Sequence, residues 1–273
     1  MSYPYGSKVL DKLGVRSMIN AQNWSTSIGG TYIEKACRRV AELCKVDAAY
    51  VTTSAAAGIT MTTAACIAGR DEKKWAKLPF TDDPPISGRN RILIQTNQSA
   101  YDIQYAAGGG RLVKVGGPEG ASLEDFEVEI DEKTAAIAAG YHYNVVPRGW
   151  TPYDALAELA KKHDLPCFCD CAGAFPPYGN LHRINDWGFD ISIFSGGKGI
   201  RGPQDTGLIL GTGERAVELI EEIRKNSSPN MGFGRAFKVS KENIVGLVTA
   251  LELILSRDED AEYAKQLVKA EYM

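Results

Sequence analysis

The chain has 273 residues, of which 44% are hydrophobic and 24% charged, with a formal net charge of −3. This composition is typical of a soluble globular enzyme, and the length suits one large or two smaller domains. The negative net charge excludes a general attraction to phosphate backbones. No apolar run is long enough to span a bilayer. The N-terminal sequence MSYPYGSK lacks the apolar core of a signal peptide. We therefore expect a cytoplasmic protein with no membrane partner and no nucleic-acid partner.

Helix-like and strand-like segments alternate along the chain. In chain order, the predicted elements are a helix at 33–45, a helix at 54–68 ended by Gly69, a surface excursion at 73–90, a strand at 91–95, a helix at 100–107, strands at 111–115 and 135–139, a helix at 152–163 with Thr151 as its N-cap, strands at 166–170, 191–194 and 208–210, and helices at 214–225 and 241–256 separated by a turn-rich loop at 227–234. This alternation predicts an α/β fold with a largely parallel sheet.

Six cysteines in a chain of this class are expected to be reduced thiols. Cys167, Cys169 and Cys171 alternate along one predicted strand, so they share one face. A soft metal is one reading of that face. Packing is the reading we favour, because a thiol is a small hydrophobe and adjacent strand positions rarely converge on one tetrahedral centre.

A carboxylate stands at the end of the same predicted strand, in the segment CDCAGA. Alternation places Asp170 and Ala172 on the face opposite the cysteines. Ligands of open parallel sheets lie beyond the carboxyl ends of the strands, and a carboxylate there can keep a pyridinium nitrogen protonated above a small residue. An Asp at a strand end is equally often a helix cap or a surface charge.

The segment FSGGKG follows the next predicted strand. Lys198 lies between glycines that allow a bulky ligand to approach the backbone closely. We expect its amine to be partly desolvated and therefore nucleophilic towards carbonyl groups. Ser195 can donate to a phosphate oxygen, but a flexible turn with an exposed lysine is an equal alternative on this segment alone.

The predicted helix that begins at Ser54 offers a place for an anion. The segment TTSAAAG supplies hydroxyls and free amide groups where the helix dipole favours negative charge, although Ser and Thr are also ordinary N-caps. Together with the Asp170 and Lys198 segments, it supplies an anion cradle, a partner for a ring nitrogen and an imine-forming amine. This set favours pyridoxal phosphate as the cofactor.

These segments resemble the selenocysteine synthase (L-seryl-tRNA selenium transferase) family of fold-type-I pyridoxal phosphate enzymes, which includes D-glucosaminate-6-phosphate ammonia-lyase. The resemblance covers nearly the whole chain and is strongest in FSGGKGIRGPQDTGLILG; GVRSMINA and GRAFKVSKE support it. It implies a fold-type-I large domain with a mostly parallel seven-stranded sheet. It also implies that Lys198 carries the cofactor as a Schiff base and that Asp170 pairs with the pyridine nitrogen. The remaining implied cofactor contacts are Ser54, Ala55, Ala56, Ala172, Ser195 and Gly197.

The substrate side of the implied site is less defined. Candidates for substrate or interface contacts are Asn20, Arg201, Gln204 and Arg235. Where the family often has a histidine that stacks on the ring, the segment NQSAYD has none. Gln98 and Asn97 are the candidates to cover the ring face, and Tyr101 is a candidate to contribute.

Length is the larger departure from the family, whose members usually continue into a small C-terminal domain. We expect an N-terminal arm at 1–30, a cofactor-binding large domain at 31–240, and a linker helix with the start of a largely missing C-terminal domain at 241–273. The alternatives are a truncated gene product, one half of a split enzyme, or a protein whose site another chain completes.

The leading functional hypothesis is elimination of water or ammonia from a hydroxy or phosphorylated amino acid. One alternative is an L-seryl-tRNA selenium transferase; the net charge and the early start of the GVR segment favour a small-molecule substrate instead. Another alternative is a non-catalytic pyridoxal-phosphate-binding protein or half of a split enzyme. The resemblance implies a homodimer or a higher oligomer.

Overall fold

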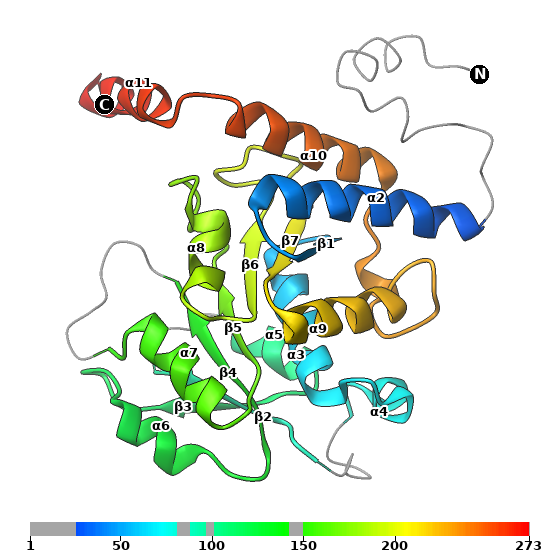
Figure 1. Ribbon diagram of the computed structural model, residues 1–273, viewed down its shortest axis with the longest axis vertical. Helices are drawn as coiled ribbons and strands as arrows, with labels where there is room; N and C mark the ends of the chain where they lie inside the picture. Colours follow the sequence, from blue (N-terminus) through cyan, green and yellow to red (C-terminus); the bar gives the residue numbers. More distant parts are fainter. Residues whose placement is uncertain (1–25, 81–87, 97–100, 142–149, 273) are drawn as a thin grey trace.

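The computed structural model describes residues 26–80, 88–96, 101–141 and 150–272 (Figure 1). Its strands are β1 (Ala48–Thr52), β2 (Arg91–Gln95), β3 (Arg111–Val115), β4 (Thr134–Gly140), β5 (Cys167–Asp170), β6 (Ile191–Ser195) and β7 (Gly207–Gly211). Its helices are α2 (Thr26–Cys44), α3 (Ala55–Ala68), α4 (Glu72–Lys77), α5 (Asp102–Ala107), α6 (Leu123–Glu129), α7 (Tyr153–Lys162), α8 (Asn180–Asp186), α9 (Glu214–Lys225), the 3-10 helix η2 (Arg235–Phe237), α10 (Lys241–Leu255) and α11 (Glu259–Tyr272).

The seven strands form one sheet in the order β1-β7-β6-β5-β4-β2-β3. All neighbouring pairs from β3 across to β6 are parallel, and β7 is antiparallel to both β6 and β1. The predicted α/β fold with a mostly parallel seven-stranded sheet is therefore confirmed. The connection from β6 to β7 is too short for a crossover helix, which is why β7 reverses direction.

Helices cover both faces of the sheet. On one face, α3 contacts β6 and β7, with α5 and α9 beside it. On the other face, α7 contacts β4 and α8 contacts β6, whereas α2 covers β1 and α10 lies along α2 (Figure 1). Because both faces are covered, β4 and β7 are buried along their whole length, as expected of interior strands.

The central helix α3 lies very close to the sheet because its residues are small. A Cβ added to Gly58 would lie 2.6 Å from Ile193 Cγ2, so only glycine permits this approach. The Ser54 hydroxyl caps the helix by accepting a hydrogen bond from Ala57 N at 3.0 Å, and Gly69 ends it with φ of 51°. The predicted start and stop of this helix are both confirmed.

Two local predictions are wrong. Thr151 does not cap α7: its hydroxyl donates to Ala121 O at 2.6 Å and its N–H donates to Gln95 Oε1 at 2.9 Å, so it ties α7 to the β2 side of the sheet instead. The segment 73–90 is not only a surface excursion, because it contributes most of α4, whose Trp75 is buried with its ring N–H on Gly69 O at 2.8 Å.

Candidate active site

The sheet register brings the predicted functional segments to one edge. Asp170, the last residue of β5, is in register with Gly140 at the end of β4 and with Ile193 in β6. Ser195 at the end of β6 is in register with Gly207, which also pairs with Thr52 at the end of β1. The ends of β1, β5 and β6 and the start of β7 therefore meet at the carboxyl edge, where ligands of such sheets bind.

The functional side chains at this edge share the face that α3 and α5 cover. Phe168 and Asp170 alternate onto the same side of β5, and the Phe168 ring lies 6.0 Å from that of Tyr105 in α5. In β6, Ser195 is on the same side as Ile193, which contacts α3 at Gly58. Asp170 and Ser195 therefore both face the side of the sheet from which α3 begins.

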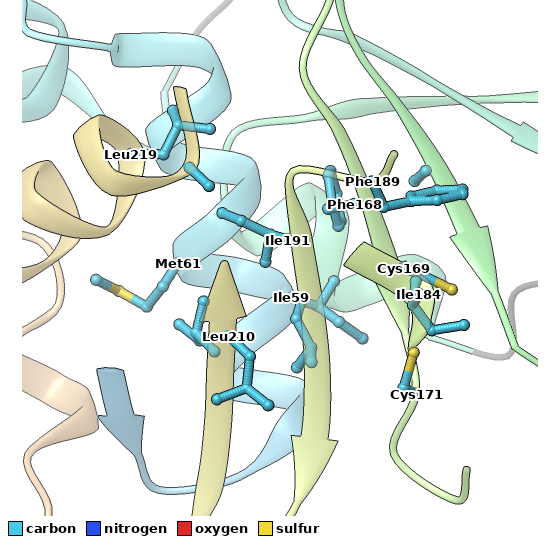
Figure 2. Close-up of a cluster of buried hydrophobic side chains, with 14 of the residues drawn as sticks. Ile59, Met61, Phe168, Cys169, Cys171, Ile184, Phe189, Ile191, Leu210 and Leu219 are labelled. Carbon is cyan, nitrogen blue, oxygen red and sulfur yellow. The ribbon is translucent and has the colours of Figure 1, made fainter. Parts of the chain in front are cut away.

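The three alternating cysteines lie on the opposite face and are buried. Cys167 Sγ is 3.6 Å from Gly188 O, and Figure 2 shows Cys169 and Cys171 beside Ile184 of α8. Burial raises the pKa of the Cys169 thiol well above its ordinary value, and hydrogen bonding to Cys171 and nearby charges act in the same direction. Neutral, buried thiols agree with the packing interpretation. Within the described ranges, no three His, Cys, Asp or Glu side chains are grouped as they would be around a metal ion.

The N-terminus of α3 sits directly on Gly207. A Cβ at Gly207 would lie 2.3 Å from the carbonyl carbon of Ser54 and 2.7 Å from Ala55 N. Helix geometry leaves the N–H groups of Ala55 and Ala56 without intrahelical partners, so they are available to an anion at the positive end of the dipole. The buried Thr52 hydroxyl, next to this end, has no hydrogen-bond partner in the part of the chain that the structure describes.

The lysine segment forms a tight loop between β6 and β7. Arg201 N donates to Lys198 O at 2.9 Å, and Gly202 N donates to Gly196 O at 2.8 Å. Added Cβ atoms would lie 2.6 Å from Gln204 Cα at Gly197 and 1.9 Å from Phe175 O at Gly199. Glycine is therefore needed on both sides of the lysine because the loop is pressed against neighbouring backbone.

Lys198 itself is exposed in the single chain. The expected partial desolvation of its side chain is therefore wrong for this chain alone. The physical reason is that its flanking glycines hold the loop backbone against Gln204 and Phe175, which leaves the lysine side chain on the open side.

Asp170 is half-buried and firmly oriented. Ala172 N donates to Asp170 Oδ1 at 3.0 Å, and Tyr141 N donates to the Asp170 carbonyl at 2.8 Å. A carboxylate fixed in this way beside the small Ala172 can hold a proton on the nitrogen of a flat ring.

The candidate substrate residues are not gathered at this edge as a group. Arg201 is exposed, and its Nη1 lies 3.5 Å from Glu262 Oε2 of α11; Gln204 is exposed beside the loop. Arg235 donates to Ser228 Oγ at 2.9 Å and to Pro229 O at 3.1 Å, in a loop that contacts Met61, two turns along α3 from Ser54. Asn20 and Gln98 lie outside the described residues.

Sequence reasoning missed the residues that set the spacing of the site. Gly207 is noticed only when the register is known, because β1 and β7 pair although they are far apart in the sequence. Thr52, one of the hydroxyls of the TTSAAAG segment, is placed beside Gly207 by the same register. Phe175, which braces Gly199, carries no sequence signal beyond its place after the Asp170 turn.

Comparisons with known proteins point to one family. A family model described as L-seryl-tRNA selenium transferase matches residues 100–269. The chain is 30% identical over 287 residues to a 5'-C-glycyluridine monooxygenase-decarboxylase from a Streptomyces species, an alignment that covers 93% of this chain and 67% of that protein. It is also 30% identical to D-glucosaminate-6-phosphate ammonia lyase from Salmonella typhimurium, over 81% of this chain and 57% of the relative.

A third relative, the L-seryl-tRNA(Sec) selenium transferase of Maridesulfovibrio salexigens, is 28% identical over 84% of this chain and 46% of that protein. A solved structure of D-glucosaminate-6-phosphate ammonia-lyase matches with a TM-score of 0.75 at 25% identity, covering 94% of this chain and 64% of that one. The chain thus spans about half to two thirds of the length of these relatives.

Proposed function

This chain belongs to the L-seryl-tRNA selenium transferase family, and we propose that it is a pyridoxal-phosphate-dependent lyase for a hydroxy or phosphorylated amino acid. Its sheet is that of the large domain of fold-type-I pyridoxal phosphate enzymes. The observation that carries the proposal is that three segments lie at one sheet edge: the α3 N-terminus, the end of β5 with the oriented Asp170 carboxylate, and the loop after β6 that contains Lys198.

The described residues fit this cofactor. The cradle formed where Gly207 admits the Ser54 backbone suits a phosphate, which the N–H groups of Ala55 and Ala56 and the hydroxyls of Ser54 and Ser195 would hold. Asp170 would face the ring nitrogen, with Ala172 under the ring, and Lys198 and Gly197 would lie at its carbonyl end. When bound, pyridoxal phosphate supplies an electron sink for a carbanion at the substrate α-carbon.

The chain's own residues then have separate tasks. Lys198 Nζ would bind the cofactor covalently and would be the base that accepts a proton from the substrate α-carbon. The Asp170 carboxylate would hold a proton on the ring nitrogen. The α3 N-terminus would hold the phosphate and so orient the cofactor towards Lys198.

An assay for released ammonia and keto acid tests the proposal. The cofactor-loaded chain is incubated with serine, hydroxy amino acid phosphates and D-glucosaminate 6-phosphate, with Lys198→Ala as the matched control. Turnover that Lys198→Ala lacks supports the lyase. Selenium incorporation into seryl-tRNA without lyase turnover would favour the transferase alternative. Cofactor binding without any turnover would favour a binding-only protein.

The monooxygenase-decarboxylase relative motivates one further arm of that assay. Oxygen uptake is followed with the same substrates, because the name of that relative describes a monooxygenase that acts on 5'-C-glycyluridine. Uptake of oxygen in step with substrate loss would contradict the lyase proposal and favour oxidative chemistry at the same residues.

We also propose a small-molecule substrate and a homo-oligomer. The net charge of −3 disfavours tRNA, and the exposed Lys198 needs a cover that excludes water from its reaction. None of the helices in the described part of the chain is long and apolar enough to cross a membrane. Sedimentation of the cofactor-loaded protein tests the proposal of an oligomer, which a purely monomeric and active species would contradict.

A further inference from the structure

The first turn of α11 makes two contacts near the lysine loop, one with a backbone N–H and one with a side chain, although α11 follows α10 at the far end of the chain (Figure 1). Glu259 Oε1 accepts a hydrogen bond from Tyr178 N at 2.7 Å. Glu262 Oε2 lies 3.5 Å from Arg201 Nη1. Both partners belong to the two segments that frame Lys198: the turn after Asp170 and the loop after Ser195.

The Glu259 contact reaches the lysine through a short chain of packed groups. The ring of Tyr178 stacks on Phe175 with centroids 5.3 Å apart and planes 8° from parallel. Phe175 O in turn lies against Gly199, where a Cβ would be only 1.9 Å away. Gly199 is the residue after Lys198, so a shift of the 175–178 segment would displace the lysine backbone.

The Glu262 contact reaches the lysine from the other side. Arg201 has φ of 61°, a conformation that a non-glycine residue adopts only at a cost, so the surrounding structure must hold it. Its N–H donates to Lys198 O at 2.9 Å, which closes the turn that contains the lysine. The Arg201 guanidinium therefore connects Glu262 of α11 to this turn.

Glu262 is suited to a fixed position. Its side chain is only 13% exposed, and besides Arg201 it lies 3.4 Å from Arg257 and 2.8 Å from Lys265. These cations lower its pKa, with the Lys265 hydrogen bond as the largest cause, so it stays ionised at neutral pH. Arg257 and Lys265 belong to the α11 end of the chain and orient the Glu262 carboxylate there, so that it faces Arg201. The exposed Arg201 pair contributes little stability by itself, so its effect is on the position of the loop.

We propose that Glu259 and Glu262 are positioning residues for Lys198: together they fix the direction in which its side chain leaves the loop. The proposal deepens the proposed function and rests on it. Misplacement of a reacting group by about 1 Å can cost about 100-fold in rate. Loss of both contacts should therefore slow covalent attachment of the cofactor without abolishing it.

The test separates attachment from binding. Glu259→Ala, which removes the acceptor for Tyr178 N, Glu262→Gln and the double variant are compared with the wild type. Asp260→Asn serves as the control because it removes a charge from an exposed position of the same turn. The rate of borohydride-trapped attachment of pyridoxal phosphate to Lys198 is measured by peptide mass. In parallel, the affinity for pyridoxamine 5'-phosphate, which cannot attach to the lysine, is measured by fluorescence.

The double variant should attach the cofactor about tenfold or more slowly, with each single variant between it and the wild type, while pyridoxamine phosphate affinity and Asp260→Asn stay unchanged. Attachment at the wild-type rate in the double variant would overturn the proposal. A parallel fall in pyridoxamine phosphate affinity would also overturn it, because that result indicates a merely structural role. If the wild type itself attaches no cofactor at Lys198, the proposed function fails instead.

Discussion

The contact between Gly207 and the start of α3 gives a sharp prediction about the anion cradle. Gly207→Ala would place a Cβ 2.3 Å from the Ser54 carbonyl carbon, about 1 Å inside ordinary contact, and the obstructing atoms are backbone. Either β7 or the whole N-terminus of α3 must move. Overpacking of this kind costs about 1–3 kcal/mol, and the lower chain entropy of alanine returns about 0.4–1 kcal/mol, so we expect a net loss of about 1–2 kcal/mol in the free energy of unfolding.

The same displacement should weaken cofactor binding. Loss of one charge-assisted hydrogen bond from a helix N–H to phosphate costs about 1.5–3 kcal/mol, which corresponds to roughly 10- to 100-fold in the dissociation constant. Urea unfolding and a pyridoxal phosphate titration measure the two effects. Gly117→Ala is the matched control, because a Cβ there meets nothing within 4 Å. Unchanged stability and affinity in Gly207→Ala would refute the reasoning.

Two further changes test other parts of the site, and a third tests a buried thiol at the end of α2. Ser54→Asp should keep the N-cap and change the free energy of unfolding by no more than about 0.5 kcal/mol, because Asp caps a helix as well as Ser. It should bind pyridoxal phosphate far more weakly, because its carboxylate repels the phosphate. Equal affinity in a titration would show that the phosphate does not bind at this helix end. Asp170→Asn should retain the cofactor but lose turnover by about 100-fold, since its charge no longer holds the ring proton; steady-state activity equal to wild type would argue against that role. Burial raises the pKa of Cys44 to about 12, so above about pH 8.5 the unfolded chain loses a proton that the folded chain keeps, and the stability that this thiol contributes falls as pH rises. Between pH 9 and 10.5, the free energy of unfolding should therefore fall less steeply in Cys44→Ala than in the wild type, by about 1.4 kcal/mol per pH unit; identical slopes in urea unfolding would contradict the cause.

Local signals in the sequence predict most of the fold. The predicted bounds are correct for three elements, the strands at 91–95 and 111–115 and the helix at 214–225. Each of them has turn glycines nearby or a clear periodicity of its own. The strand β1 was missed, since AAYVT is short and shows no alternation of apolar and polar residues. Thr151 was misread because a threonine before a proline resembles a cap, whereas a buried partner in another element decides its hydrogen bond.

The pattern of apolar residues in β7 does not reveal its direction, but the length of the segment before it does. A parallel strand after β6 would need a crossover of a dozen or more residues with a helix, and the glycine-rich 196–206 segment has none. For the site, strand-end positions predict Asp170 and Lys198 as candidates from the sequence. The exposure of Lys198 and the bracing by α11 depend on tertiary contacts between distant segments, so no local pattern predicts them.

Borohydride reduction of the protein loaded with pyridoxal phosphate, followed by peptide mapping, tests the central claim most directly. The account predicts a yellow protein in which the reduced cofactor is attached to Lys198 and in which Lys198→Ala loses both the absorbance and the attachment after dialysis. Attachment at another lysine, or an unchanged absorbance in Lys198→Ala, would contradict it.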